Sequence, residues 1–158
     1  DVQDAGGIRA LNVAAGNGAV DVMKLLIERG ADVDRPTVHY GGPLGFAAHF
    51  GQRAATEVLA PLSRDVHNLA FLGMKQRLGE LFAAAPALAN LEHPRSGKTP
   101  LFALPPDEAV ALDVARFLLA HGADPAWRHT DGDTPADAAR KNGFEALAAL
   151  LGEARARR

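Results

Sequence analysis

The chain of 158 residues contains no cysteine, which excludes disulfide-stabilised folds, thiolate zinc sites, iron–sulfur clusters and cysteine nucleophiles. Serine is also scarce: Ser63 and Ser96 are the only two, and neither lies in the Gly-x-Ser-x-Gly pattern of serine hydrolases. No apolar run approaches the roughly 20 residues that a membrane-spanning helix needs. The net charge of −2 provides no excess of positive charge for binding nucleic acid or an anionic membrane.

The remaining composition is that of an ordinary globular protein, with 47% hydrophobic and 23% charged residues. At this length we expect a single domain over residues 1–158. No basic segment followed by an apolar one opens the sequence, so we expect no signal peptide and a cytoplasmic location. Arginine outnumbers lysine 13 to 4 and alanine is abundant, which favours a GC-rich bacterial gene.

A repeat of 33 residues organises the sequence. Leu11 and Leu44 lie 33 residues apart, and each begins the pattern Leu-x-x-Ala-Ala-x-x-Gly. Related segments begin with Thr-Pro at residues 99–100 and 134–135. A second element, an apolar run that ends in Gly-Ala-Asp, occurs at residues 25–32 and 118–124. Such self-similarity indicates a repeat fold rather than a single irregular domain.

Each part of the pattern has a physical role. Thr-Pro begins a helix, because the Thr hydroxyl can cap free backbone N–H groups and Pro needs no donor there. Glycines such as Gly18 and Gly51 end the helix by supplying a left-handed turn. A second helix follows with apolar residues at helical spacing, as at Val22 and Leu26. We expect Leu26 and Leu69 to lie in the core.

With these motifs the sequence resembles the ankyrin repeat family over nearly its whole length. The resemblance implies an all-α solenoid of about five helix–turn–helix units with short β-hairpin fingers. It also implies that the chain binds a protein partner through the concave groove and the fingers. The expected units cover about residues 4–36, 37–63, 64–93, 94–128 and 129–155.

Several units depart from the family pattern. Val66 follows Leu44 by 22 residues instead of 33, so the finger between units 2 and 3 is expected to be missing. Unit 4 carries about three extra residues around residues 104–107, and its second helix is expected over residues 107–120. Unit 5 carries charged residues such as Arg140 where an inner unit is apolar, which is typical of the end of a solenoid.

The resemblance also indicates where a partner binds. In the family, the two residues after Ala-Ala face the concave groove, and here several of them are aromatic or aliphatic in units 2 and 3. Exposed aromatic side chains are typical of binding hot spots. The finger positions before units 2 and 5 add further aromatic residues, and His67 matches the motif histidine of the family. The predicted binding residues are His39, Tyr40, His49, Phe50, His67, Phe71, Leu72 and Trp127.

Other interpretations remain open. Without the finger, Phe50, Phe71 and Leu72 could pack on one another as additional core. Alternatively, the groove could be a small-molecule pocket or an unusual enzyme site with a histidine as acid or base. The residues of that pocket would be His39, Tyr40, His49, Asp65 and His67. A purely structural spacer is a third possibility. The sequence predicts no catalytic residue, no metal and no cofactor, since the histidines lack zinc-ligand spacing.

Overall fold

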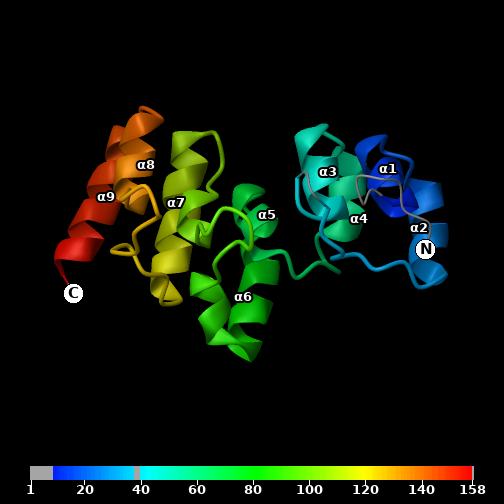
Figure 1. The fold of residues 1–158 in the computed structure, drawn as a ribbon, viewed down its shortest axis with the longest axis horizontal. Coiled ribbons are helices and arrows are strands. Elements are labelled where there is room, and N and C mark those ends of the chain that lie inside the picture. Colours follow the sequence, from blue (N-terminus) through cyan, green and yellow to red (C-terminus); the bar gives the residue numbers. More distant parts are fainter. Residues whose placement is uncertain (1–8, 38–39, 158) are drawn as a thin grey trace. The chain divides into compact units, whose positions relative to one another are not determined.

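The computed structural model describes residues 9–37 and 40–157 of the chain. The contacts divide it into two compact units, residues 1–68 and 69–158, and each is described here by itself. The described residues form nine α-helices and two short 3₁₀ helices, with no β-strand among them (Figure 1). Within this part of the chain, no helix is both long and apolar enough to cross a membrane.

The first unit is built from two helix pairs, α1 (Ala10–Gly16) with α2 (Val20–Glu28), and α3 (Pro43–His49) with α4 (Arg53–Leu59). Helix α1 packs against α2 and α3, and α2 packs against α4, so the second pair stacks on the first. Small and branched side chains fill the space between the helices. The core residues are Leu11, Ala14, Ala15, Met23, Leu44, Ala47, Ala55 and Leu59.

Leu26 was expected to lie in the core, and for this unit that prediction is wrong. Leu26 is only half-buried and Val22 is exposed, whereas Met23 is completely buried. Among the described residues, α3 and α4 pack on the pair α1–α2, and Met23 is the completely buried side chain of α2. The helical spacing of apolar residues is therefore correct, but the covered face lies one residue further around α2.

A short link joins α4 to α5 (Val66–Phe71) and consists of residues 60–65. Asp34, in the loop before α3, binds this link directly: its carboxylate accepts hydrogen bonds from Ser63 Oγ at 2.7 Å and from Arg64 N–H at 2.9 Å. At the end of the link, Asp65 Oδ1 accepts from Asn68 N–H at 3.1 Å and so caps α5. The link is too short to form a hairpin finger of its own.

The second unit contains α6 (Lys75–Ala84), α7 (Glu108–Ala120), α8 (Pro135–Lys141) and α9 (Glu145–Ala156). Two 3₁₀ helices, η1 (Pro86–Asn90) and η2 (Pro100–Phe102), lie between α6 and α7. Helix α9 packs against α7 and α8, and η1 packs against α6. The buried residues include Leu69, as expected, together with Leu78, Leu101, Val114, Leu118, Leu147 and Leu151.

The helix expected after Thr99-Pro100 is reduced to the three residues of η2. The reason is the Pro-Pro pair at residues 105–106, since the residue before a proline is disfavoured in helical conformation and a proline cannot donate the next hydrogen bond. The second helix of this segment is as expected: Asp107 Oδ1 accepts from Val110 N–H at 3.0 Å and caps α7.

The loops that the sequence predicts as fingers share one backbone hydrogen bond. In each loop an N–H donates to the carbonyl of the residue just before the next helix cap: Thr37 to Gly41 at 2.8 Å, His93 to Lys98 at 2.9 Å, and His129 to Asp133 at 2.9 Å. These bonds close tight loops without forming a β-strand in the described residues. The β-hairpin form of the fingers and the number of five repeat units stay predictions.

Candidate functional site

Helix α3 brings three ring side chains to one face of the first unit. Phe46, His49 and Phe50 are spaced at i, i+3 and i+4, so they project from the same side of the helix. Phe46 is buried at the base, while His49 is exposed and 53% of Phe50 is exposed. Phe50 also packs over α1, where a Cβ on Gly16 would lie 3.2 Å from Phe50 Cδ2.

Tyr40 joins these residues from the loop before α3, because its backbone is fixed in an unusual conformation. Its φ of 53° lies in the left-handed region that a bulky residue rarely adopts. The Tyr40 carbonyl lies over Gly45 so closely that a Cβ there would come within 1.6 Å of it. Asn68 Nδ2 donates to this carbonyl at 3.3 Å and to Asp65 Oδ2 at 2.7 Å, which ties the loop to the start of α5.

The four rings of Tyr40, Phe46, His49 and Phe50 form what we call the aromatic surface. Tyr40 stacks on His49 with ring centroids 3.8 Å apart and planes inclined by 20°. Tyr40 meets Phe46 edge to face at 5.3 Å, and His49 meets Phe50 edge to face at 4.9 Å. Both arrangements are favoured aromatic geometries. Tyr40 is 45% exposed, so the surface is held in place by its own ring contacts while it faces solvent.

The structure thus brings together three of the predicted binding residues, Tyr40, His49 and Phe50. His39 lies outside the described residues. His67 is buried in α5, so its side chain is not an open contact surface. The other predicted residues belong to the second unit and are described there: Phe71 is exposed, and Leu72 and Trp127 are half-buried.

The sequence pattern did not single out Phe46 as a site residue. The signal that could have found it is its helical spacing to His49 and Phe50, which places all three on one face. Nor did it recognise Phe102 and His129, which pack with Trp127 in the second unit.

Asp65 has a structural role. One oxygen of its carboxylate accepts from the Asn68 backbone and the other from the Asn68 amide. Asp65 is therefore a helix cap. Within the described residues, no group of three or more His, Asp or Glu side chains is placed to hold a metal ion.

The second unit has an aromatic group of its own around Trp127, the only tryptophan of the chain. The Trp127 ring meets Phe102 of η2 edge to face at 5.6 Å, and His129 lies 6.4 Å from both rings. Lys98 Nζ lies 5.8 Å above the Phe102 ring, in cation–π range. We call Phe102, Trp127 and His129 the finger cluster, since two of its three residues come from the loop region before α8.

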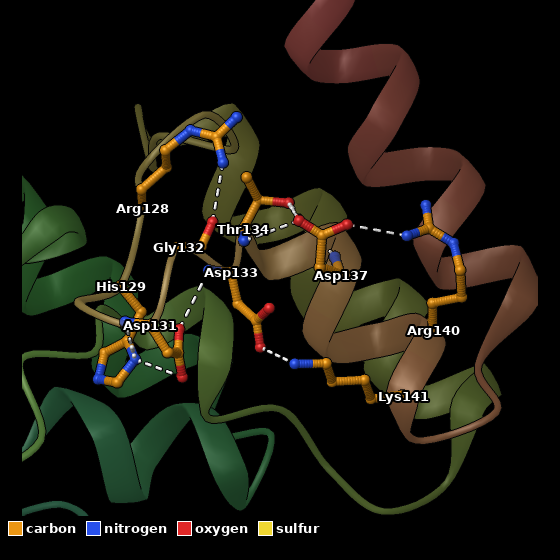
Figure 2. Close-up of polar contacts among 9 residues, drawn as sticks. All are labelled: Arg128, His129, Asp131, Gly132, Asp133, Thr134, Asp137, Arg140 and Lys141. Carbon is orange, nitrogen blue, oxygen red and sulfur yellow. Dashed lines mark hydrogen bonds and ion pairs between the residues drawn. The ribbon is translucent and has the colours of Figure 1, made fainter.

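Charged side chains hold the loop of the finger cluster against α8 (Figure 2). Thr134 and Asp137 form a reciprocal cap at the start of α8, with Thr134 N–H donating to Asp137 Oδ2 at 3.0 Å and Asp137 N–H donating to Thr134 Oγ1 at 3.3 Å. The Thr134 hydroxyl and N–H, aided by Arg140, hold the pKa of Asp137 well below its usual range. Asp133 pairs with Lys141 and raises the pKa of that amine.

Comparison with known proteins agrees with the repeated helix pairs. The family model described as ankyrin repeat matches residues 6–35, which include α1 and α2. A search of curated proteins finds no match to this sequence. The matched pair α1–α2 is followed, 33 residues further on, by the pair α3–α4, which has the same order of helix, glycine turn and helix. Residues 6–35 therefore match the ankyrin repeat family, and the next helix pair repeats the same arrangement.

Proposed function

We propose that this protein is a binding module that holds a protein partner on the aromatic surface of Tyr40, Phe46, His49 and Phe50. Ankyrin repeats generally mediate protein–protein interaction. The observation that supports this particular surface is that Tyr40 and Phe50 are 45% and 53% exposed and yet fixed by ring contacts. A preorganised aromatic anchor loses little side-chain entropy when a partner covers it.

The predicted groove runs past repeat units 2 and 3, and the residues of the aromatic surface belong to repeat unit 2. The link of residues 60–65 takes the place of the finger that the repeat pattern predicts there. In the second unit, taken by itself, the exposed Phe71 and the finger cluster around Trp127 are separate contact positions that we propose for a protein partner. We expect the protein to act in the cytoplasm, and cell fractionation tests this location.

A matched set of variants tests the proposal. Partners are captured from an extract of the source organism, identified by mass spectrometry, purified and titrated by calorimetry against each variant. A buried aromatic anchor contributes about 2 kcal/mol or more to binding, so we expect Phe50→Ala and Tyr40→Ala to weaken the complex tenfold or more. Lys24→Ala in α2 and Arg116→Ala in α7 replace exposed charged side chains outside the surface, and binding should be unchanged.

Thermal unfolding of the same variants separates loss of binding from loss of folding. Phe50→Ala should unfold within a few degrees of the wild type, since half of its side chain is already exposed. If Phe50→Ala unfolds far earlier, the residue belongs to the core and the proposal is wrong. If both aromatic variants bind as the wild type does, the partner uses another surface, and Trp127→Ala is the next variant to test.

A further inference from the structure

The second unit contains an open pocket between η2, α8 and α9. Its walls include Leu101 and Leu104 on the side of η2, Ala138 and Asn142 from α8, and Leu147 from α9. Of the described side chains that line it, none is charged and Asn142, at the exposed edge, is the only polar one. The space measures about 300 Å³ with the solvent at its mouth included, so its enclosed part is smaller than sites for drug-sized ligands. A group that fills this pocket is therefore small and apolar.

The pocket exists because the helix before α8 is short. In the first unit, α1 ends at Gly16, and a Cβ on Gly16 would lie 3.2 Å from the Phe50 ring and 3.6 Å from the Phe46 ring of α3. In the second unit the corresponding helix is η2, which ends at Phe102. The prolines at 105–106 cannot continue it. The helical turn that would cover this part of α8 is missing.

Helices α3 and α8 follow the same pattern but carry different side chains on the face toward the preceding helix. Each begins with a proline and is followed by a glycine of positive φ. After the proline, α3 continues to Phe46 and Phe50, and Ala138 and Asn142 occupy the same positions in α8. The backbone of Asn142 (φ −86°, ψ 1°) matches that of Phe50 (φ −90°, ψ 9°). A methyl group and an amide thus lie where the first unit has two phenyl rings.

We propose that the pocket receives the phenyl ring of a phenylalanine side chain from a protein partner. The first unit fills the equivalent space with its own phenyl rings, so a ring is the group whose shape fits between these elements. The uncharged lining excludes a charged side chain, which would lose its hydration there without gaining an ion pair.

The pocket also adjoins a proposed contact surface. Phe102 forms part of its lining and belongs to the finger cluster, where it meets the Trp127 ring. A partner that contacts Trp127 therefore lies next to the mouth of the pocket. The inference rests on the proposed function, because it takes the ring to belong to a protein partner.

The pocket can be tested with a small probe and without the partner. N-acetyl-phenylalaninamide is a capped phenylalanine residue, and N-acetyl-glycinamide has the same backbone without the ring. Each is titrated into the whole chain while NMR follows the methyl signals of Leu104, Ala138 and Leu147. We expect these signals to shift and saturate with the phenylalanine compound. The glycine compound should bind about tenfold more weakly or not at all, because burial of the ring drives binding.

Asn142→Phe supplies the ring from the chain itself. We expect this variant to bind the phenylalanine compound about tenfold more weakly, and to unfold at the same or a higher temperature, since substitutions that fill a cavity commonly stabilise a protein. Ala138→Leu fills the pocket from the second position and should cause the same loss of binding. The matched control is Asn17→Phe, because Asn17 is the exposed residue at the same position of α1, and it should bind the probe as the wild type does.

Three results would overturn the proposal. One is that the glycine compound shifts the same signals as strongly. Another is that folded Asn142→Phe and Ala138→Leu bind the phenylalanine compound as well as the wild type. The third is that toluene saturates the pocket while the phenylalanine compound does not, since the site would then take a free aromatic molecule. The titrations involve neither the partner nor the aromatic surface, so a failure of the proposed function, seen in Phe50→Ala and Tyr40→Ala, is a separate result.

Discussion

Thr99 and Thr134 hold the same place in neighbouring segments, each directly before a proline that begins a helix. Thr134 Oγ1 accepts a hydrogen bond from the Asp137 N–H, whereas Thr99 makes no side-chain cap bond. In the part of the chain that the structure describes, the Thr99 hydroxyl is buried without a hydrogen-bond partner. One hydroxyl thus satisfies a helix N–H, while the other is a buried polar group that costs free energy.

We therefore predict opposite outcomes for the two threonines. Thr134→Ala should lower the free energy of unfolding by about 0.5–2 kcal/mol, because the cap of α8 is lost. Thr99→Val keeps the shape of the side chain and removes the unpaired hydroxyl, so stability should be unchanged or higher. Urea unfolding measures both. A loss for Thr99→Val as large as that for Thr134→Ala would contradict the assignment of an unpaired hydroxyl.

Asp137 makes the stability of α8 depend on pH. Its pKa is lowered below the ordinary value of 3.8, first by Thr134 and then by Arg140. The ionised carboxylate therefore makes its full contribution to the free energy of unfolding above pH 3.8, and this contribution is lost as the pH falls through the folded-state pKa. Asp137→Asn removes the charge that Arg140 contacts at 2.8 Å. We expect the variant to be less stable than the wild type at pH 7, with the difference narrowing below pH 4. Thermal unfolding from pH 7 to pH 2 tests this, and a difference that stays constant would be the contrary result.

At the scale of elements, helix α3 shows what a sequence pattern can and cannot predict. The 33-residue repeat predicted the helix and its glycine turn, but it left open whether Phe50 is exposed in a groove or packed as core. The stack of Tyr40 on His49 was not predictable, because it depends on the left-handed backbone of Tyr40 and on its carbonyl lying against Gly45. Likewise, Thr-Pro indicated a helix at residue 100, but the prolines at 105–106 end it within one turn.

The contact at Gly45 gives a prediction for α3. Gly45→Ala places a methyl group against the Tyr40 carbonyl, so the loop must move, and we expect a loss of about 1–3 kcal/mol, as for other overpacked sites. The matched control is Gly152→Ala in α9, where nothing lies within 4 Å of the new Cβ. That change should stabilise the protein by about 0.5–1 kcal/mol, because alanine is the better helix former.

Both glycine variants can be measured by chemical unfolding, and circular dichroism in the aromatic region reports the ring packing. Gly45→Ala should also change the aromatic signal, since Tyr40 stacks on His49 and meets Phe46. If Gly45→Ala is as stable as the wild type with an unchanged aromatic signal, the close approach of the Tyr40 carbonyl is wrong.

At the scale of the whole molecule, the repeat explains why the prediction of Leu26 as a core residue failed. Val13 and Val22 are exposed, while the residues 33 positions later, Phe46 and Ala55, are buried. The later residues are covered because α1 and α2 pack on α3 and α4, and the first pair has no such cover within the described residues. A repeat sequence specifies which face of a unit is apolar, but not whether a neighbour covers that face.

The same dependence on neighbours predicts how damage spreads along the chain. Met23 in α2 and Leu118 in α7 are completely buried, in the first and second compact unit respectively. Met23→Ala and Leu118→Ala should each cost about 2–5 kcal/mol, the usual range for truncation of a large buried side chain.

In a repeat protein each unit is stabilised by its nearest neighbours, so the loss should be local. Hydrogen exchange measured by mass spectrometry should show Met23→Ala accelerating exchange in α1–α4 while α7–α9 keep their protection, and Leu118→Ala should show the reverse. If either variant instead accelerates exchange equally in all helices, residues 1–158 unfold as one cooperative domain and stability does not follow the repeat.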